Sequence, residues 1–210
     1  MACDCCEDQE YLTLGDEVPE FDLITFEPTR GDFGEFSLSK AKAAKKWTIL
    51  FFYPGDFTFV CTTEFAALAE LHEQFVRLGA ELITVSTDSK YVHLAWHQHE
   101  AGLKHAKFVM GADPTGNLSR LFDVYNEETG QAFRGTFLID PDGKLLAKEV
   151  HFGDVGRNID ELLRKFKAYL HVSQNPTEAC PSKWKDKGDA TLKPSAKMVG
   201  NVYAADGNFK

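Results

Sequence analysis

One cysteine in the chain stands where a buried strand is expected to give way to a helix. Cys61 follows an apolar run at residues 47–53 and comes before a segment of helical periodicity. Apolar residues recur there at a spacing of three and four, at Leu68, Leu71, Phe75 and Leu78. Such spacing predicts an amphipathic helix. Because free backbone N–H groups and the positive end of the helix dipole stabilise an anion, Cys61 is predicted to be a reactive thiolate.

A thiolate of this kind is suited to attack a peroxide. As the O–O bond breaks, negative charge grows on the departing oxygen, so the site needs hydrogen-bond donors and shielding from water. Thr58, one helical turn before Cys61, offers a hydroxyl, and Pro54 offers a ring that covers the sulfur without presenting an N–H. A guanidinium has to come from elsewhere in the chain. Arg134, at the start of the expected strand "RGTFLID", is the candidate.

Each of these residues also has an ordinary interpretation. Cys61 alone could be a small buried hydrophobe, because free cysteine is among the most buried residue types. Arg134 could be a surface residue of its strand, and Thr58 could be a plain helix N-cap. The occurrence of Pro54, Thr58 and Cys61 in one short pattern favours the chemical interpretation.

Pro54, Thr58 and Cys61 form the P-x-x-x-T-x-x-C pattern of peroxiredoxins, and Arg134 occupies the place of that family's site arginine. The chain resembles the family over residues 14–198, including "YPGDFTFVCTTE", "VSTDSKYVHLAWH", "GADPTG" and "EACPSKWK". It is most similar to typical two-cysteine peroxiredoxins of the type found as the peroxidase subunit of bacterial alkyl hydroperoxide reductase. Several motifs in the right order are far more specific than one.

The resemblance implies a thiol peroxidase with a role in antioxidant defence and cell redox homeostasis. Cys61 would be the peroxidatic cysteine, oxidised to sulfenic acid as hydrogen peroxide or an organic hydroperoxide is reduced to water or an alcohol. Cys180 would be the resolving cysteine, which attacks from the other subunit's arm to form an intersubunit disulfide; its ordinary interpretation is an inert packing residue. Glu64 and Arg157 match family positions where the carboxylate helps to hold the site arginine.

The same resemblance implies an α/β, thioredoxin-like fold: a central mixed β-sheet flanked by helices, with an extended C-terminal arm. It divides the chain into a Cys-rich extension at 1–13, expected to be flexible, a peroxiredoxin domain at 14–170 and an arm at 171–210 that carries the resolving cysteine. Members form homodimers that often assemble into decameric rings, and the resemblance implies no metal or other cofactor. A thioredoxin-like protein or an NADH-dependent flavoprotein disulfide reductase would serve as reductant.

Periodicity along the chain predicts elements that suit this fold. Strands are expected at 17–26, 31–39, 45–54, 81–88, 107–110, 134–140 and 144–152, and helices after Cys61 and at 90–100, 117–125 and 158–170. Within the strand expected at 45–54, the run at 47–53 is continuously apolar, which predicts a central strand covered on both faces. Strands that alternate with helices, followed by a late hairpin, predict an α/β sandwich.

The composition argues against several other classes of protein. The 210 residues suffice for one α/β domain with an arm. A formal net charge of −9 leaves no basic surplus to neutralise the phosphates of a nucleic acid. No stretch approaches the ~20 apolar residues of a membrane span, and the acidic start "MACDCCEDQE" does not resemble a signal peptide. Five cysteines, an odd number, do not suit a secreted disulfide framework, so a cytoplasmic location is expected.

The sequence departs from the family pattern in three places. Thr62 stands where the family has proline, and we expect it to shift the balance between the folded helix and the unwound form needed for disulfide formation. "EAGLKH" and "NVYAADGNFK" stand where overoxidation-sensitive members carry a Gly-Gly-Leu-Gly loop and a Tyr-Phe helix, which favours a robust, bacterial-type enzyme. Cys3, Cys5 and Cys6 have no counterpart, and we favour an adventitiously reactive end over a soft-metal site or a thiol relay.

Alternative functions depend on other features. His93 and His97 lie at i and i+4 of an expected helix, but Leu94 stands where a zincin needs Glu, so packed or surface histidines are favoured over a metal site. A general thiol–disulfide oxidoreductase would need C-x-x-C, and Cys61 is followed by "TTE". A redox-regulated oligomeric scaffold or holdase chaperone is the alternative to a peroxidase, and it predicts that function survives Cys61→Ser.

Overall fold

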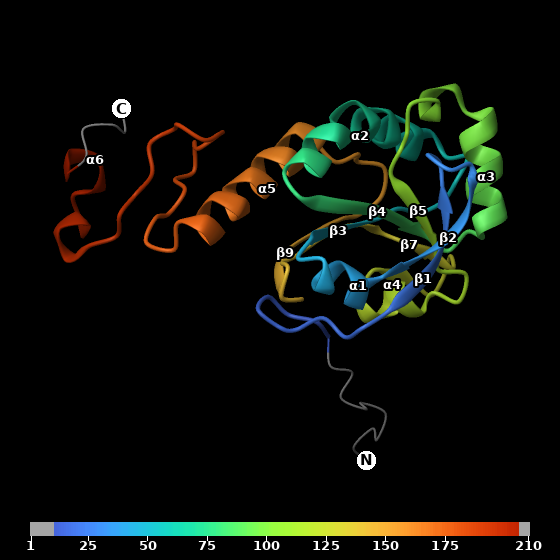
Figure 1. Cartoon of the computed structure of the whole chain (residues 1–210), viewed down its shortest axis with the longest axis horizontal. Coiled ribbons are helices and arrows are strands. Elements are labelled where there is room, and N and C mark those ends of the chain that lie inside the picture. Colours follow the sequence, from blue (N-terminus) through green and yellow to red (C-terminus); the bar gives the residue numbers. More distant parts are fainter. Residues whose placement is uncertain (1–10, 206–210) are drawn as a thin grey trace, which may run out of the picture. The chain divides into compact units, whose positions relative to one another are not determined.

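The computed structural model describes residues 11–205, and the chain divides into two compact units. The first unit ends at Arg157 and the second begins at Asn158 (Figure 1). Cys3, Cys5 and Cys6 lie outside the described residues. Among the described residues, no helix combines the length and the apolar character that crossing a membrane requires.

The first unit is built on a seven-stranded mixed sheet with the strand order β2-β1-β5-β4-β3-β8-β9. Its strands are β1 (Asp22–Glu27), β2 (Asp32–Ser37), β3 (Trp47–Phe52), β4 (Ala80–Ser86), β5 (Val109–Ala112), β8 (Arg134–Ile139) and β9 (Leu145–His151). Strand β4 pairs in parallel with β3 and β5, and the remaining pairs are antiparallel. The short strands β6 (Tyr125–Asn126) and β7 (Gln131–Ala132) form a separate hairpin.

Helices cover both faces of this sheet (Figure 1). On one face lie α2 (Phe59–Arg77) and α3 (Lys90–His99), and on the other lie α1 (Leu38–Ala43) and α4 (Asn117–Leu121). A single 3-10 turn, Ala101–Leu103, follows α3. All six residues of β3 are buried, which confirms the prediction of a central strand covered on both faces. The strand therefore delivers the chain from the middle of the sheet directly to the start of α2.

Some predicted boundaries are wrong, for local reasons. The strand expected at 31–39 ends at Ser37, because the good helix formers Lys and Ala that follow it form α1 instead. The helix expected at 117–125 ends at Leu121, where Asp123 adopts a left-handed φ of 54° and turns the chain toward β6. The hairpin of β6 and β7 was not predicted, since two-residue strands leave no periodicity.

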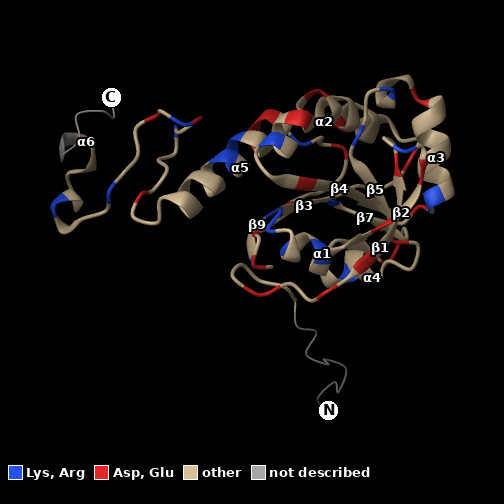
Figure 2. Ribbon diagram, viewed as in Figure 1, with Lys and Arg blue, Asp and Glu red and all other residues tan. Residues whose placement is uncertain are grey.

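The second unit consists of α5 (Ile159–Gln174) and the segment that follows it, with α6 (Val202–Ala205) near its end. Asn158 caps α5, accepting a hydrogen bond from the backbone N–H of Glu161. The domain boundary predicted after residue 170 lies inside this helix. After α5 the chain folds back on itself through a bridge between Ala179 and Leu192. Figure 2 shows basic and acidic residues interspersed along both units.

Candidate active site

The loop between β3 and α2 places Cys61 beyond the C-terminal end of the central strand β3. Thr58 is the N-cap of α2, with extended dihedral angles (φ −103°, ψ 153°), and Cys61 lies in the first turn of the helix. The exposed fraction of Cys61 is 0%. The hydroxyl of Thr58 does not cap the helix but donates to the carbonyl oxygen of Gly55 at 2.8 Å. The cysteine therefore occupies the predicted strand-to-helix junction, with its sulfur shielded from water.

Pairing between β3 and β8 places Arg134 against this cysteine. The two strands are antiparallel with Phe51 opposite Thr136, so the start of β8 lies beside the end of β3. The side chain of Arg134 is 5% exposed. Its Nη1 donates to the Sγ atom of Cys61 at 3.1 Å and to Oε2 of Glu64 at 2.9 Å. One guanidinium thus bridges the thiol and a carboxylate.

Glu64 lies one helical turn after the cysteine and is the acceptor for two arginines. Its carboxylate accepts four hydrogen bonds, one from Arg134 and three from the backbone N–H, Nε and Nη2 of Arg157, at 2.8–3.0 Å. Arg157 also donates to Thr136 Oγ1 at 3.1 Å, and its guanidinium lies 3.2 Å from the ring centroid of Phe51. The two arginines and Glu64 form a buried cluster with fixed geometry.

The charged side chains around Cys61 do not balance one another. Burial raises the pKa of Glu64, but hydrogen bonds and charge from Arg157, together with the charge of Arg134, outweigh it and hold the pKa below its ordinary value. Burial lowers the pKa of Arg134, but its bonds to Cys61 and Glu64 reverse this and raise it. Two guanidinium cations and one carboxylate leave one uncompensated buried positive charge. A thiolate at Cys61 balances that charge, and an uncompensated buried charge is costly.

An open pocket of about 320 Å³ leads to the cluster. Pro54, Thr58 and Arg134 line it, and Arg134 also contacts the sulfur. Three aromatic rings line the same pocket, from Phe59, Phe133 and Phe152. Because a water molecule takes up about 30 Å³ in the liquid, the pocket is much larger than hydrogen peroxide requires. It has room for a peroxide that carries an organic group.

Phe133 and Phe152 were missed by the sequence reasoning. Their rings lie 6.0 Å apart, and Phe152 is 85% exposed. The predicted hairpin of β8 and β9 could have indicated them. Its antiparallel pairing places Arg134 opposite His151, one residue before Phe152. Residues that follow His151 at the end of β9 therefore had to lie close to the site arginine.

Cys180 belongs to the second unit. Its Sγ atom lies 3.8 Å from the carbonyl oxygen of Ala168 in α5, and it is partly buried. Burial raises the pKa of this thiol, Arg164 works against that effect, and Glu178 adds to it. Cys180 is therefore a protonated thiol at neutral pH. Of the residues singled out in the sequence, the structure brings together Pro54, Thr58, Cys61, Glu64, Arg134 and Arg157 within the first unit.

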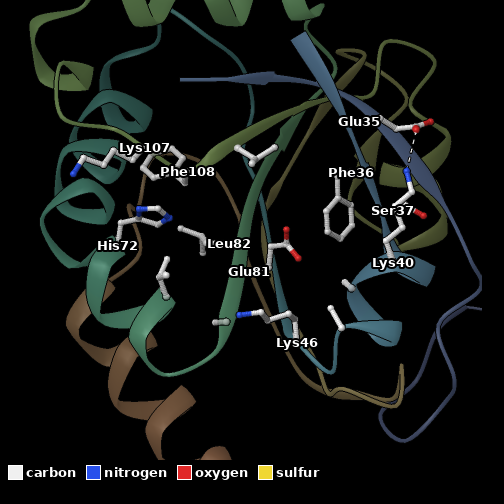
Figure 3. A pocket seen from close by; sticks show the side chains of 15 residues that line it. Glu35, Phe36, Ser37, Lys40, Lys46, His72, Glu81, Leu82, Lys107 and Phe108 are labelled. Atoms are coloured by element: carbon white, nitrogen blue, oxygen red, sulfur yellow. Dashed lines mark hydrogen bonds and ion pairs between the residues drawn. The ribbon is translucent and has the colours of Figure 1, made fainter. Parts of the chain in front are cut away.

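A separate pocket of about 500 Å³ opens at the other end of the parallel strands, beside the starts of β4 and β5 (Figure 3). Two of its lysines are paired, Lys40 with Glu35 at 3.4 Å and Lys107 with Glu73 at 3.1 Å. No cysteine is among the residues that line it. Within residues 11–205 no group of three or more His, Cys, Asp or Glu side chains has the geometry of a metal site. The two cysteines among the described residues are Cys61, which Arg134 connects to the first pocket, and Cys180.

Comparison with known proteins gives one consistent result. Residues 14–148 match the model of the AhpC/TSA family. The chain is 43% identical to alkyl hydroperoxide reductase C of Amphibacillus xylanus and 39% identical to that of Staphylococcus aureus, in each case over 90% of this chain and 98% of the relative. Among solved structures, it is similar to a reduced 2-Cys peroxiredoxin of Plasmodium vivax, with a TM-score of 0.81, 33% identity, and coverage of 89% of this chain and 98% of that one. The corresponding values for Enterococcus faecalis AhpC are a TM-score of 0.75, 35% identity, and coverage of 80% and 98%.

Proposed function

The chain belongs to the AhpC/TSA family and is a peroxiredoxin peroxidase with the thioredoxin-like fold of that family, and on this premise we propose that Cys61 is its peroxidatic cysteine. The observation that carries the proposal is the 3.1 Å contact between Arg134 Nη1 and Cys61 Sγ, within a buried cluster whose charge is balanced by a thiolate. Glu64 and Arg157 hold the guanidinium in place. The substrates that we propose are hydrogen peroxide and organic hydroperoxides.

In the first step the thiolate of Cys61 attacks the terminal oxygen of the hydroperoxide. An S–O bond forms, the O–O bond breaks, and its electron pair leaves with the departing oxygen, which takes up a proton to give water or an alcohol. The cysteine becomes a sulfenic acid. Arg134 lines the pocket, so its N–H groups can donate to the peroxide oxygens, and Pro54 keeps water from the sulfur. The hydroxyl of Thr58 also lines the pocket and can donate to a peroxide oxygen once it releases the carbonyl oxygen of Gly55.

In the second step Cys180 resolves the sulfenic acid. Its thiol sulfur forms an S–S bond to Cys61, and the sulfenic oxygen leaves as water. We propose that Cys180 comes from the arm of the other subunit of a homodimer, and that dimers assemble into a decameric ring. A dithiol of a thioredoxin-like protein or a flavoprotein disulfide reductase that uses NADH would return both cysteines to thiols. Because the cycle needs free thiols, we propose that the protein works in the cytoplasm.

Non-reducing electrophoresis with mass spectrometry tests the proposal. Reduced protein receives one equivalent of hydrogen peroxide, and Cys180→Ser is the matched control. We expect a dimer linked through Cys61 and Cys180 in the wild type, and a monomer with oxidised Cys61 in the variant. Sulfinic acid at Cys61 of the wild-type monomer would remove Cys180 from the cycle. An unchanged Cys61 would refute the peroxidase role and favour a redox-regulated scaffold or holdase.

A further inference from the structure

A buried hydrogen-bond network lies next to the peroxide pocket but outside it. The hydroxyl of Tyr53 donates to Oδ1 of Asp56 at 2.5 Å, and Nδ1 of His93 lies 2.8 Å from Oδ2 of the same carboxyl group. The side chains of Asp56 and His93 are 0% exposed. Nε2 of His93 lies 3.1 Å from the carbonyl oxygen of Gly111, and since that oxygen only accepts, Nε2 carries a proton.

A second contact holds the backbone of the same residue. The N–H of Asp56 donates to Oδ2 of Asp88 at 2.8 Å, and that oxygen also accepts from the hydroxyl of Ser86, the last residue of β4, at 2.9 Å. Asp56 is thereby tied to the end of β3 through Tyr53, to the end of β4 through Asp88, and to α3 through His93. Three elements thus fix one residue of the loop between β3 and α2.

Directly after Asp56 the backbone adopts an unfavourable conformation. Phe57 has a φ of 57°, in the left-handed region that a residue with a bulky side chain rarely adopts. Such a conformation persists only where the surrounding structure over-determines it. Thr58 then closes the turn through its bond to Gly55, and α2 begins at the next residue. The position of Asp56 therefore sets where Thr58 and the first turn of α2 lie.

We propose that Asp56 and His93 are positioning residues for the peroxidase reaction: through the loop at 54–58 they hold the hydroxyl of Thr58 in place relative to Arg134 and Cys61. The inference rests on the proposed function. Neither Asp56 nor His93 lines the peroxide pocket, so they act through the loop and not on the peroxide. A side chain that only filled space could be replaced by another of similar size, whereas this role requires the hydrogen bonds.

The test compares Asp56→Ala with Asp56→Asn in the full chain. Asparagine keeps an oxygen that accepts from Tyr53 and gains an amide that donates to Nδ1 of neutral His93, so it rebuilds the network. Two rate constants are measured for Cys61: oxidation by hydrogen peroxide, by quenched flow and mass spectrometry, and alkylation by iodoacetamide, which requires a thiolate but no Thr58 hydroxyl. We expect Asp56→Ala to slow oxidation by roughly 10- to 100-fold, as a displacement of about 1 Å in an active site does. Alkylation should change by less than about threefold, because it depends on the thiolate alone.

The conservative variant and a neighbouring histidine are the controls. Asp56→Asn should oxidise within about threefold of the wild-type rate, since its hydrogen bonds are restored. His97→Gln should leave the rate unchanged, because His97 lies on the same helix but contacts the carbonyl oxygen of Ala106. If circular dichroism shows that Asp56→Ala does not fold, His93→Gln replaces it; glutamine keeps the bond to Gly111 and loses the one to Asp56, so the same slow oxidation is expected.

Two outcomes would overturn the inference. One is a folded Asp56→Ala or His93→Gln protein that oxidises as fast as the wild type. The other is a parallel loss of oxidation and alkylation, which indicates a general loss of structure and not a displaced loop. A wild-type Cys61 that does not react with hydrogen peroxide refutes the proposed function instead, before any variant is compared, so the two failures are distinguishable.

Discussion

Replacing Arg134 by methionine tests the chemistry of the site most directly. Methionine has a similar length but carries no charge and no donor. With a thiolate at Cys61, the buried cluster would hold one guanidinium, on Arg157, against two negative charges, in place of a balanced set. Glu64 would keep three of its four hydrogen bonds, all from Arg157, so the fold should survive the change. The variant therefore separates the chemistry of the site from its stability.

The size of the effect follows from the donor that is lost. Arg134 Nη1 lies 3.1 Å from the sulfur, and the same guanidinium lines the pocket in which we propose that the peroxide binds. Removing one donor aimed at developing oxygen charge costs about 2.7–4 kcal/mol of barrier, or roughly 100- to 1000-fold in rate. Arg134→Lys keeps the charge but not the planar fork of donors, so we expect an intermediate loss of about tenfold.

The assay is the second-order rate constant for oxidation of reduced protein by hydrogen peroxide, measured by stopped flow. Arg30→Met is the matched control, because Arg30 pairs with Glu27 at the surface with its side chain 57% exposed, and such pairs contribute little. Oxidation of Arg134→Met within about fivefold of the wild-type rate would refute the reasoning, since a lost donor should cost far more than that. The observed contact would then stabilise the fold without serving the reaction.

Glu64→Gln leaves two buried guanidinium groups with a neutral acceptor, and should lower the free energy of unfolding by about 3–5 kcal/mol in urea at pH 7. The exposed control Glu127→Gln should change it little. Folding lowers the pKa of Glu64, so the stability that its carboxylate contributes is fully present above the unfolded pKa of ~4.3 and is lost as the pH falls through the lower folded value. Urea denaturation between about pH 5 and 2 should therefore show a decrease in the free energy of unfolding of the wild type that Glu64→Gln does not share. Phe152→Ala removes an apolar wall of the pocket and should lower kcat/KM for cumene hydroperoxide by roughly 3- to 10-fold while leaving that for hydrogen peroxide within about twofold, since only the organic group loses buried area. Thr62→Pro removes an N–H and a hydroxyl that both donate to the carbonyl oxygen of Thr58, so its first turn should open more readily and yield less sulfinic acid by mass spectrometry at matched peroxide; equal yields would contradict this.

Much of the site follows from local sequence patterns. The apolar run that forms β3 and the helical spacing that forms α2 place Cys61 at a junction without any tertiary information. Arg134 could be assigned because a strand that starts with it had to pair in the same sheet. Each of these inferences depends on periodicity within a short window, which is the signal that sequence carries most strongly.

Other parts depend on contacts that no short window contains. Glu64 reads as an ordinary helical glutamate, and Arg157 lies in a loop 93 positions later, so only the resemblance to a family pointed to this pair. The contact between Asp56 and His93 is hidden for a similar reason: the two residues are 37 positions apart, and the motifs that contain them do not indicate that they are partners. Buried polar networks are assembled by the fold, and their partners are determined by topology and not by local propensity.

In the proposed cycle, the peroxide step and the disulfide step require opposite states of the first turn of α2. The sulfur of Cys61 has no exposed area, so it cannot come within ~2 Å of a second sulfur unless that turn opens. The closed turn is opposed by the strained φ of Phe57 and held by the bonds from Thr62 to Thr58. Glu64, one turn further on, is held by four hydrogen bonds from two arginines. Opening is therefore easiest before Glu64, which would release the cysteine for its partner thiol while the arginine cluster stays assembled for the next peroxide.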